Sequence, residues 1–479
     1  MASHEHEVEK SSTTIGLPVS PGLSPAIAQA AIPKHISVVD RRTLLISFMC
    51  IGIALIVAPI ARLLVNLIEL ITNLAFYGRI SMQNASPAHH AWGYGVIAVP
   101  AIGALIVGFM ARYGSKAIRG HGIPEAMEQI LVNDSRIPVR MTFLKPLSAA
   151  IAIGTGGPFG AEGPIIATGG ALGSLIGQLI HVSAQERKTL LAAGAAAGMT
   201  AIFGSPISAI LLTIELLLFE FRPRSFIPVA FATIVAMSLR PWMFGTGPMF
   251  ALSGIPVASQ SAMLGYALEG IVMGLFAVGI AKSVYWIEDM FEHLPIHWMW
   301  WPALGGLAVG AIGCFYPETL GVGYDNIDKV LSGAFVGKAL IMFCIMKFLS
   351  WAIALGSGTS GGTLAPIFTI GGGIGVLTGE LLMSIFPEMG IDLRVAALVG
   401  MAACFAGASR AIFASIIFAF ETTRQFNGLL PLLAGCSVSF LVSALMMRNT
   451  IMTEKLARRG HHVPSEYVAH PVQVKGAPK

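Results

Sequence analysis

The sequence predicts an all-α integral membrane protein, and three features of its composition support that prediction. Only 11% of the 479 residues are charged, against about 25% in an ordinary soluble domain. Hydrophobic residues make up 55% of the chain, and the mean hydropathy is +0.75. Many of the 54 glycines and 27 prolines interrupt apolar stretches, which a bilayer tolerates only where broken backbone packs on protein or lines a site. A soluble enzyme, a disordered chain and a nucleic-acid-binding protein are excluded, despite the net charge of +5.

The apolar segments can be followed in order along the chain. A first span covers residues 44–76, which is longer than the roughly 20 residues that cross a bilayer upright, so this span is predicted to tilt. Further long spans are predicted at 93–110, 264–292 and 298–316. Residues 120–255 and 320–446 contain shorter apolar pieces bounded by Gly or Pro, which predicts broken helices.

The polar ends are predicted to lie in the cytoplasm. Two arginines precede the first span, and Lys and Arg outnumber Asp and Glu in the last residues. The positive-inside rule therefore puts both termini on the cytoplasmic side of a plasma, or inner, membrane. No segment has the pattern of a cleavable signal peptide. The pairs His4/His6 and His461/His462 and the five cysteines, which lack CxxC spacing, favour solvated tails and buried small side chains over a metal site.

Two parts of the chain repeat one another. Residues 145–164 and 347–366 are identical at 10 of 20 positions without a gap, and GMTAIF at 198–203 recurs as GMAACF at 400–405. The predicted parts are a polar tail 1–40, a first membrane repeat 41–240, a connecting segment 241–263, a second membrane repeat 264–450 and a C-terminal tail 451–479. The residues alone leave open whether the repeats are parallel or inverted. Matched broken segments in two repeats are typical of a transporter with its site between them.

Three Gly/Pro clusters each precede an apolar helical run. Because Pro is favoured in the first turn of a helix, each cluster is predicted to begin a helix inside the membrane. Three helix N-termini, each with free N–H groups and about half a positive charge, would bind an anion without Lys or Arg. The candidate anion-binding residues are Gly120, His121, Gly122, Ile123, Pro124, Gly160, Gly163, Thr363 and Leu364. The alternative is that such glycines let helices pack closely, which is the preferred interpretation of GGALGSLIG from Gly169.

Glu162 lies inside the second cluster, with no local partner in the sequence. A carboxylate at membrane depth is costly and marks a functional site by default. If the clusters bind an anion, ionised Glu162 competes for that site and protonated Glu162 vacates it. This predicts a pH-sensitive gate, and the alternative is a loop glutamate at the membrane surface.

The motifs GHGIPE, GAEGP and GGTLAP, with the later FETT segment, resemble the CLC chloride channels and proton-coupled chloride transporters. The similarity runs in order from about residue 44 to about residue 460. The resemblance implies an inverted repeat of about eighteen helices per subunit, a homodimer and one anion path in each subunit. It also implies that Glu162 is the external gating glutamate. The backbone amides that it places near the anion are those of Gly122, Ile123, Thr363 and Leu364.

Four positions depart from the family pattern. His121 replaces a serine whose hydroxyl helps to bind the central anion, and a histidine there could donate an N–H, titrate or simply pack. Met452 stands at the usual place of a tyrosine hydroxyl. Ala161 replaces an arginine that precedes the gating glutamate, and Leu216 replaces an inner glutamate of many proton-coupled members.

These departures favour a chloride transporter that is channel-like or weakly coupled to protons. The candidate proton path is Glu162, His121 and Glu215, although Glu215 also matches a family glutamate with a structural role. A stoichiometric proton/chloride antiporter is the alternative, and a cation-coupled carboxylate transporter is more distant because the broken regions lack Asp, Asn and Arg clusters. An enzyme is disfavoured because no base for Ser357 or Ser360 is visible. Chloride or a similar anion is the predicted ligand, without a metal, a cofactor or a nucleic-acid partner.

Overall fold

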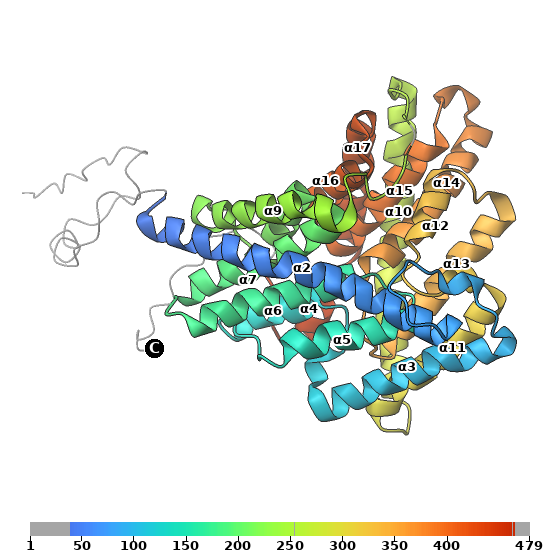
Figure 1. The fold of residues 1–479 in the computed structure, drawn as a ribbon. Helices are drawn as coiled ribbons and strands as arrows, with labels where there is room; N and C mark the ends of the chain where they lie inside the picture. Colours follow the sequence, from blue (N-terminus) through green and yellow to red (C-terminus); the bar gives the residue numbers. More distant parts are fainter. Residues whose placement is uncertain (1–38, 253, 462, 465–479) are drawn as a thin grey trace, which may run out of the picture. The chain divides into compact units, whose positions relative to one another are not determined.

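The computed structural model describes residues 39–252, 254–461 and 463–464 (Figure 1). Seventeen α-helices, α2 to α18, make up most of these ranges, where the only β-structure is two isolated bridges. Eight of the described helices are long and apolar enough to cross a membrane. The prediction of an all-α membrane protein is confirmed. Most of the two polar tails, with His4, His6 and His462, lies outside the described residues.

Each half of the chain contributes eight helices. The first eight are α2 (Arg41–Tyr77), α3 (Ala98–Phe109), α4 (Ile123–Val132), α5 (Met141–Gly154), α6 (Glu162–Leu179), α7 (Ala184–Phe203), α8 (Pro206–Thr213) and α9 (Pro223–Phe244). The second eight are α10 (Gln260–Glu292), α11 (Trp301–Phe315), α12 (Tyr324–Leu331), α13 (Gly337–Gly356), α14 (Leu364–Ile385), α15 (Leu393–Ser409), α16 (Ile412–Thr423) and α17 (Leu429–Met446). A five-residue helix, α18 (Glu454–Arg458), follows. Both halves open on a very long helix, as predicted for residues 44–76 and 264–292.

The halves meet through helices at matching places in this order, α3 against α11 and α8 against α16. The second contact is reciprocal. Glu215, just after α8, accepts the N–H groups of Phe413 and Ala414 at the start of α16, at 3.0 and 2.9 Å. Glu421, near the end of α16, accepts two N–H groups at the start of α8, at 3.0 and 2.8 Å. A contact that is returned in this way is typical of a twofold relation, and each carboxylate stabilises the positive end of a helix.

Glycine seams let helices within each half cross closely. At the crossing of α6 and α7, a Cβ on Gly169 or on Gly194 would collide with the carbonyl oxygen of the other. Gly371 and Gly400 make the same contact where α14 crosses α15. Close packing of GGALGSLIG is thereby confirmed. The seams fix α6 and α14, two of the three helices that begin at the candidate site.

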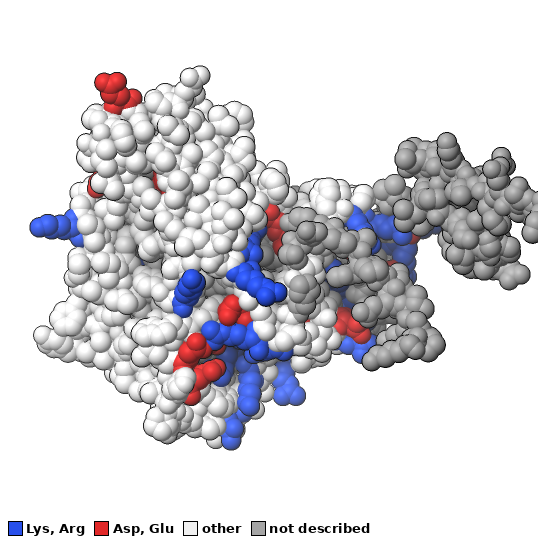
Figure 2. All heavy atoms as spheres, turned by 180° about the vertical axis from the view of Figure 1, so that it is seen from behind, with Lys and Arg blue, Asp and Glu red and all other residues white. Residues whose placement is uncertain are grey.

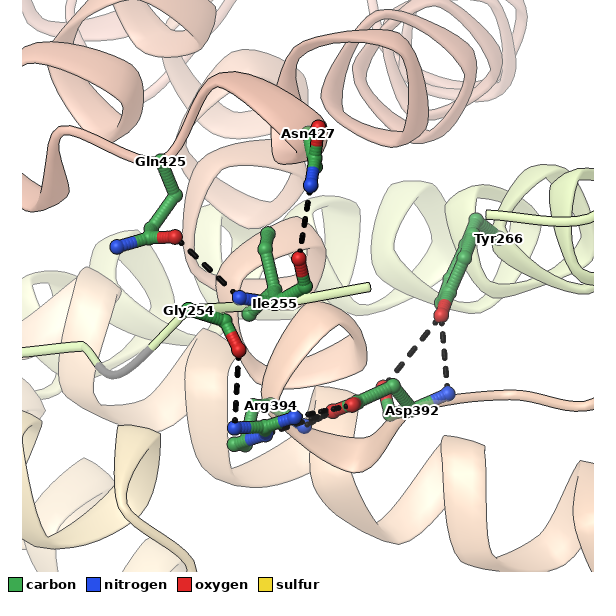
Figure 3. Close-up of polar contacts among 7 residues, drawn as sticks. All are labelled: Gly254, Ile255, Tyr266, Asp392, Arg394, Gln425 and Asn427. Carbon is green, nitrogen blue, oxygen red and sulfur yellow. Dashed lines mark hydrogen bonds and ion pairs between the residues drawn. The ribbon is translucent and has the colours of Figure 1, made fainter. Parts of the chain in front are cut away.

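The segment that connects the halves is anchored to the second half. Figure 3 shows Gly254 and Ile255 between side chains of that half. Arg394 donates to Gly254 O at 3.4 Å, and Asn427 donates to Ile255 O at 2.9 Å. Gln425 Oε1 accepts the Ile255 N–H at 3.4 Å. These contacts hold the chain in place ahead of α10.

Charged side chains occupy only part of the surface. In the view of Figure 2 most of them gather in the lower middle of the face and toward its right, a few stand singly at the edges, and most of the rest is white, without charge. Large apolar side chains point outward instead, among them Phe48, Leu63, Phe143, Trp242 and Leu445. Exposed apolar side chains on long helices are expected where lipid replaces water.

Candidate functional site

Backbone hydrogen bonds tie together the three Gly/Pro clusters, although these lie far apart in the sequence. The Gly120 amide donates to Thr359 O at 3.0 Å, and the Gly361 amide donates to Gly120 O at 3.4 Å. Gly160 and Gly362 exchange amide hydrogen bonds at 3.2 and 2.9 Å. The loops before α4, α6 and α14 therefore meet. The structure brings the three helix N-termini to one place.

The local sequence explains why these loops can approach so closely. Gly120 and Gly122 have φ angles of +97° and +95°, in a region that residues with a side chain avoid. A Cβ on Gly122 would collide with Gly163 O, and one on Gly163 would collide with His121 O. Pro124, in the first turn of α4, suits a helix start. The glycines of the clusters thus let the loops pack closely at the positions where the helices begin.

Two buried lysines at matching positions of the repeats support the loops. Lys145 in α5 donates from Nζ to two carbonyls of the loop before α4, both at 2.8 Å. Lys347 in α13 donates to two carbonyls of the loop before α12, at 2.9 and 3.3 Å. These carbonyls lie where the helices are interrupted and need donors other than the helix backbone. The lysines are therefore part of the frame around the site.

Glu162 is the first residue of α6, and only 1% of it is exposed. Its Oε1 accepts a hydrogen bond from the Tyr324 hydroxyl at 3.0 Å. Its Oε2 has no hydrogen-bond partner among the described residues, and a Cβ on Gly362, two residues before α14, would lie 2.9 Å from this oxygen. Glu162 is therefore a buried helix residue and not an exposed loop glutamate.

A cleft of about 460 Å³ reaches the cluster from one direction and is called the His121 cleft. Its lining includes Lys116, Arg119, Gly120, His121, Glu125, Tyr285, Glu288, Glu292, Lys455 and Arg459. His121 is only 5% exposed, and its Nδ1 has no hydrogen-bond partner in the part of the chain described. A buried ring nitrogen without a partner next to a cleft is a candidate ligand contact.

A second cleft of about 620 Å³ is called the Tyr324 cleft. Its lining includes Arg62, Glu69, Ala161, Arg240, Glu318, Tyr324, Asp325, Asp328 and Lys329. Glu162 lines neither cleft, but Ala161 and Tyr324 line this one and Gly120 and His121 line the other. Glu162 therefore contacts the Tyr324 cleft through the hydroxyl of Tyr324, and its neighbour Gly163 packs on His121 of the other cleft.

The backbone amides of the cluster fall into two groups. Those of Gly120, Gly122 and Gly160 already donate hydrogen bonds within the protein. Those of Ile123, Thr363 and Leu364 have no acceptor among residues that the structure describes. The N–H groups left free for a ligand are thus at the starts of α4 and α14.

Two other predicted site residues have hydrogen bonds elsewhere in the fold. Glu215 has both carboxylate oxygens bonded to the start of α16, which supports its structural interpretation. Met452 is fully buried in the turn before α18, where its amide donates to Thr450 Oγ1 at 3.1 Å. It does not line the His121 cleft, whereas Ile451 and Lys455 do.

The sequence reasoning missed three residues. Tyr324 reaches Glu162 across 162 positions of sequence, and no local motif announces it. Lys455 pairs with Glu125 at 2.7 Å and so ties α18 to α4. Glu269 in α10 is 1% exposed, and its Oε1 has no partner among the described residues. An isolated carboxylate in a long apolar stretch was the available signal for Glu269.

Interrupted helices whose ends meet around a buried carboxyl, among eight described helices that could cross a membrane, are typical of a helical membrane transport protein. The chain belongs to the voltage gated chloride channel family, whose sequence model matches residues 102–444. That family consists of channels and transporters rather than enzymes. Chloride is the ion that it moves.

Two relatives and one solved structure indicate how close the similarity is. A ClcB-like chloride channel protein of Ralstonia nicotianae is 27% identical over 75% of this chain and 85% of its own length. The H(+)/Cl(-) exchange transporter ClcA of Citrobacter koseri is 28% identical over 79% of this chain and 82% of its own. The crystal structure of a slow cyanobacterial Cl-/H+ antiporter superimposes with a TM-score of 0.76 at 22% identity, over 88% of this chain and 98% of that one. This likeness confirms the predicted CLC fold.

Proposed function

We propose that the chain conducts chloride or a similar anion between the Tyr324 cleft and the His121 cleft, with Glu162 as the gate. The observation that carries the proposal is the position of the Glu162 carboxyl, buried beside Gly362 just before α14 and bonded to Tyr324 of the Tyr324 cleft. Each subunit of a homodimer has its own path in this proposal. Free amides at Ile123, Thr363 and Leu364 are the binding groups for the anion.

The gate works by competition for the same helix end. An ionised carboxyl at the start of α14 takes the favourable position at the positive end of the helix dipole. A protonated carboxyl has lost that attraction, so an anion can replace it. Partial charges bind the anion weakly enough for it to leave, which suits conduction. Flux therefore rises as the pH falls.

The His121 cleft is the cytoplasmic mouth in this proposal. Four basic side chains line it, Lys116, Arg119, Lys455 and Arg459, and basic residues favour the cytoplasmic side. Both termini then face the cytoplasm and the Tyr324 cleft faces outward, in a plasma membrane. His121 lines this cleft, and its buried Nδ1 has no partner among the described residues, so it takes the anion-binding role of the missing serine hydroxyl.

We infer channel-like or weakly coupled transport, because the groups that could pass protons inward are few. Leu216 has no proton to exchange, and the carboxylate of Glu215 is occupied by helix N–H groups. The alternative, a proton/chloride antiporter, is favoured by the name of the ClcA relative. The reversal potential under a pH gradient at equal chloride distinguishes the two. We expect no shift for a channel and a small fraction of the stoichiometric shift for weak coupling, whereas the full shift that a fixed proton/chloride ratio requires would establish the antiporter.

The gate is tested by flux from chloride-loaded liposomes across a pH series. We expect chloride efflux with little potassium efflux, increasing at low pH. Glu162→Gln removes the titrating group, so its flux no longer depends on pH. Glu69→Gln, which neutralises a carboxylate in the lining of the Tyr324 cleft, is the matched control and keeps the wild-type dependence. A Glu162→Gln variant with the wild-type pH profile would refute the gate, and cation-selective flux would refute the anion path.

A further inference from the structure

We propose that Tyr324 is a positioning residue that holds ionised Glu162 in its closed place. The two residues come from different halves of the chain, and their contact is the hydrogen bond of 3.0 Å between the Tyr324 hydroxyl and Glu162 Oε1. The inference rests on the proposed gating role of Glu162 and adds a second residue to that gate. This contact is called the latch.

The direction of the hydrogen bond follows from the second contact of the hydroxyl. The Ala161 N–H points at the Tyr324 hydroxyl oxygen, at 3.4 Å. A hydroxyl has one proton to donate. With its oxygen accepting from Ala161, that proton is directed to the Glu162 carboxylate. A hydrogen bond donated to an ionised carboxylate is stronger than one between neutral groups, so the latch favours the charged form of Glu162.

The hydroxyl is held in place by packing of the tyrosine ring. Phe203 contacts the ring edge to face, with centroids 6.0 Å apart and planes at 88°. Phe250 makes a second ring contact with Tyr324, with centroids 6.2 Å apart and planes at 61°. Tyr324 is also the first residue of α12, behind Gly323 at φ +73°. A phenylalanine would keep these contacts and lose only the hydroxyl.

Tyr324 also connects the carboxyl to the Tyr324 cleft. The tyrosine and Ala161 line this cleft, and Glu162 does not. The latch is therefore the side-chain contact between Glu162 and the lining of the cleft. In the family pattern an arginine stands at position 161. Here the residue is Ala161, so no charged side chain stands beside Tyr324 at this position.

Other groups around the latch titrate or carry charge. On the loop before α4 the titratable group is His121, and the cleft lining adds Glu69, His89, Glu318, Asp325 and Asp328. The basic side chains of the cleft are Arg62, Arg240 and Lys329. Within the described residues, Tyr324 is the one side chain that hydrogen-bonds to Glu162. Loss of the tyrosine hydroxyl therefore acts on Glu162 itself.

The test is Tyr324→Phe, with chloride flux measured in liposomes as a function of pH. Without the hydroxyl the ionised, closed state loses stabilisation, so Glu162 takes up a proton more readily. We expect the pH of half-maximal flux to rise by about one unit. At one unit above the wild-type midpoint, the flux then rises about fivefold. Tyr266→Phe, which removes a hydroxyl bonded to the backbone of Asp392, is the matched control and leaves the midpoint unchanged.

The double variant Tyr324→Phe/Glu162→Gln separates the latch from the gate. If the latch acts through Glu162, this variant has the same flat pH profile as Glu162→Gln alone. A Tyr324→Phe midpoint equal to or below that of the wild type, with a flat Glu162→Gln profile, overturns the latch and leaves the gate standing. A pH-dependent Glu162→Gln variant overturns the gate, and the latch with it.

Discussion

The two halves of the chain share a frame and differ at the site. Lys145 and Lys347 support interrupted loops in the same way, and Glu215 and Glu421 exchange the same helix contact. The site residues do not follow this pairing. Tyr324 occupies the place of Ile123 in the repeat alignment, and Leu364 the place of Glu162. The supporting contacts are thus present in both halves, but the gate is present once. The first half contributes the carboxyl of Glu162, and the second half contributes its hydrogen-bond donor, Tyr324.

The frame itself differs in how the two lysines are balanced. Lys145 has a carboxylate, Glu125, in its electrostatic surroundings. The matching place in the second half is Asn326, which donates to Glu318 O at 2.7 Å. Lys347 is bonded to carbonyl oxygens, and among the described residues no carboxylate pairs with it. The two lysines therefore occupy matching positions, but only Lys145 has a carboxylate near its charge.

The largest expected effect follows from removing each lysine. Lys145→Met leaves Glu125 with one cationic neighbour fewer, leaves Ile118 O without a donor and takes one of the two donors from Gly120 O, so it costs about 3 kcal/mol of unfolding free energy. Lys347→Met removes hydrogen bonds to carbonyls alone and costs about 2 kcal/mol. Denaturant titration in one detergent measures both values. Lys338→Met, an exposed lysine on the same helix α13, is the control with no measurable loss.

The order of the two losses decides whether the comparison holds. A larger loss for Lys347→Met than for Lys145→Met would contradict the role given to Glu125. Equal losses would mean that the carbonyl contacts alone set the stability. In that case the two halves of the frame are energetically alike.

The second prediction concerns the reciprocal carboxylates. Glu215→Gln and Glu421→Gln each weaken two charge-assisted hydrogen bonds at a helix N-terminus, for about 1–2 kcal/mol of unfolding free energy. The twofold relation predicts equal costs for the two variants. Glu388→Gln, an exposed glutamate in the turn after α14, serves as control. Unequal costs of Glu215→Gln and Glu421→Gln, beyond about 0.5 kcal/mol, would break the symmetry argument.

Composition and motifs predicted the membrane class, the long first helices of each half and the three helix starts. These features are local, because Gly and Pro at a helix start act within a few residues. The latch could not be predicted in this way. In the repeat alignment Tyr324 stands at a position where the other half has the apolar Ile123. Its hydroxyl gains a role only when folding brings α12 to α6, and a single sequence records no such contact.

The smallest expected effect concerns Glu269, a buried carboxyl in α10 of the second half. A methyl group on Gly375 of α14 would lie 2.8 Å from its Oε1, so the glycine makes room for it. In the described part of the chain this oxygen has no hydrogen-bond partner, and no basic side chain pairs with the carboxyl. A buried polar atom without a partner lowers the stability of the fold.

Glu269→Met replaces this carboxyl with an apolar side chain of similar length. Removing a buried polar group that has no partner is nearly neutral or stabilising, so we expect the melting temperature in detergent to stay within about 2 °C or to rise. Glu269→Gln adds N–H donors that have no acceptors, so we expect its melting temperature to be lower than that of Glu269→Met. A marked drop for Glu269→Met would reveal a partner for the carboxyl. A stable Glu269→Met protein with altered chloride flux would instead make Glu269 a second titrating group of transport, set in the half that lacks the gate.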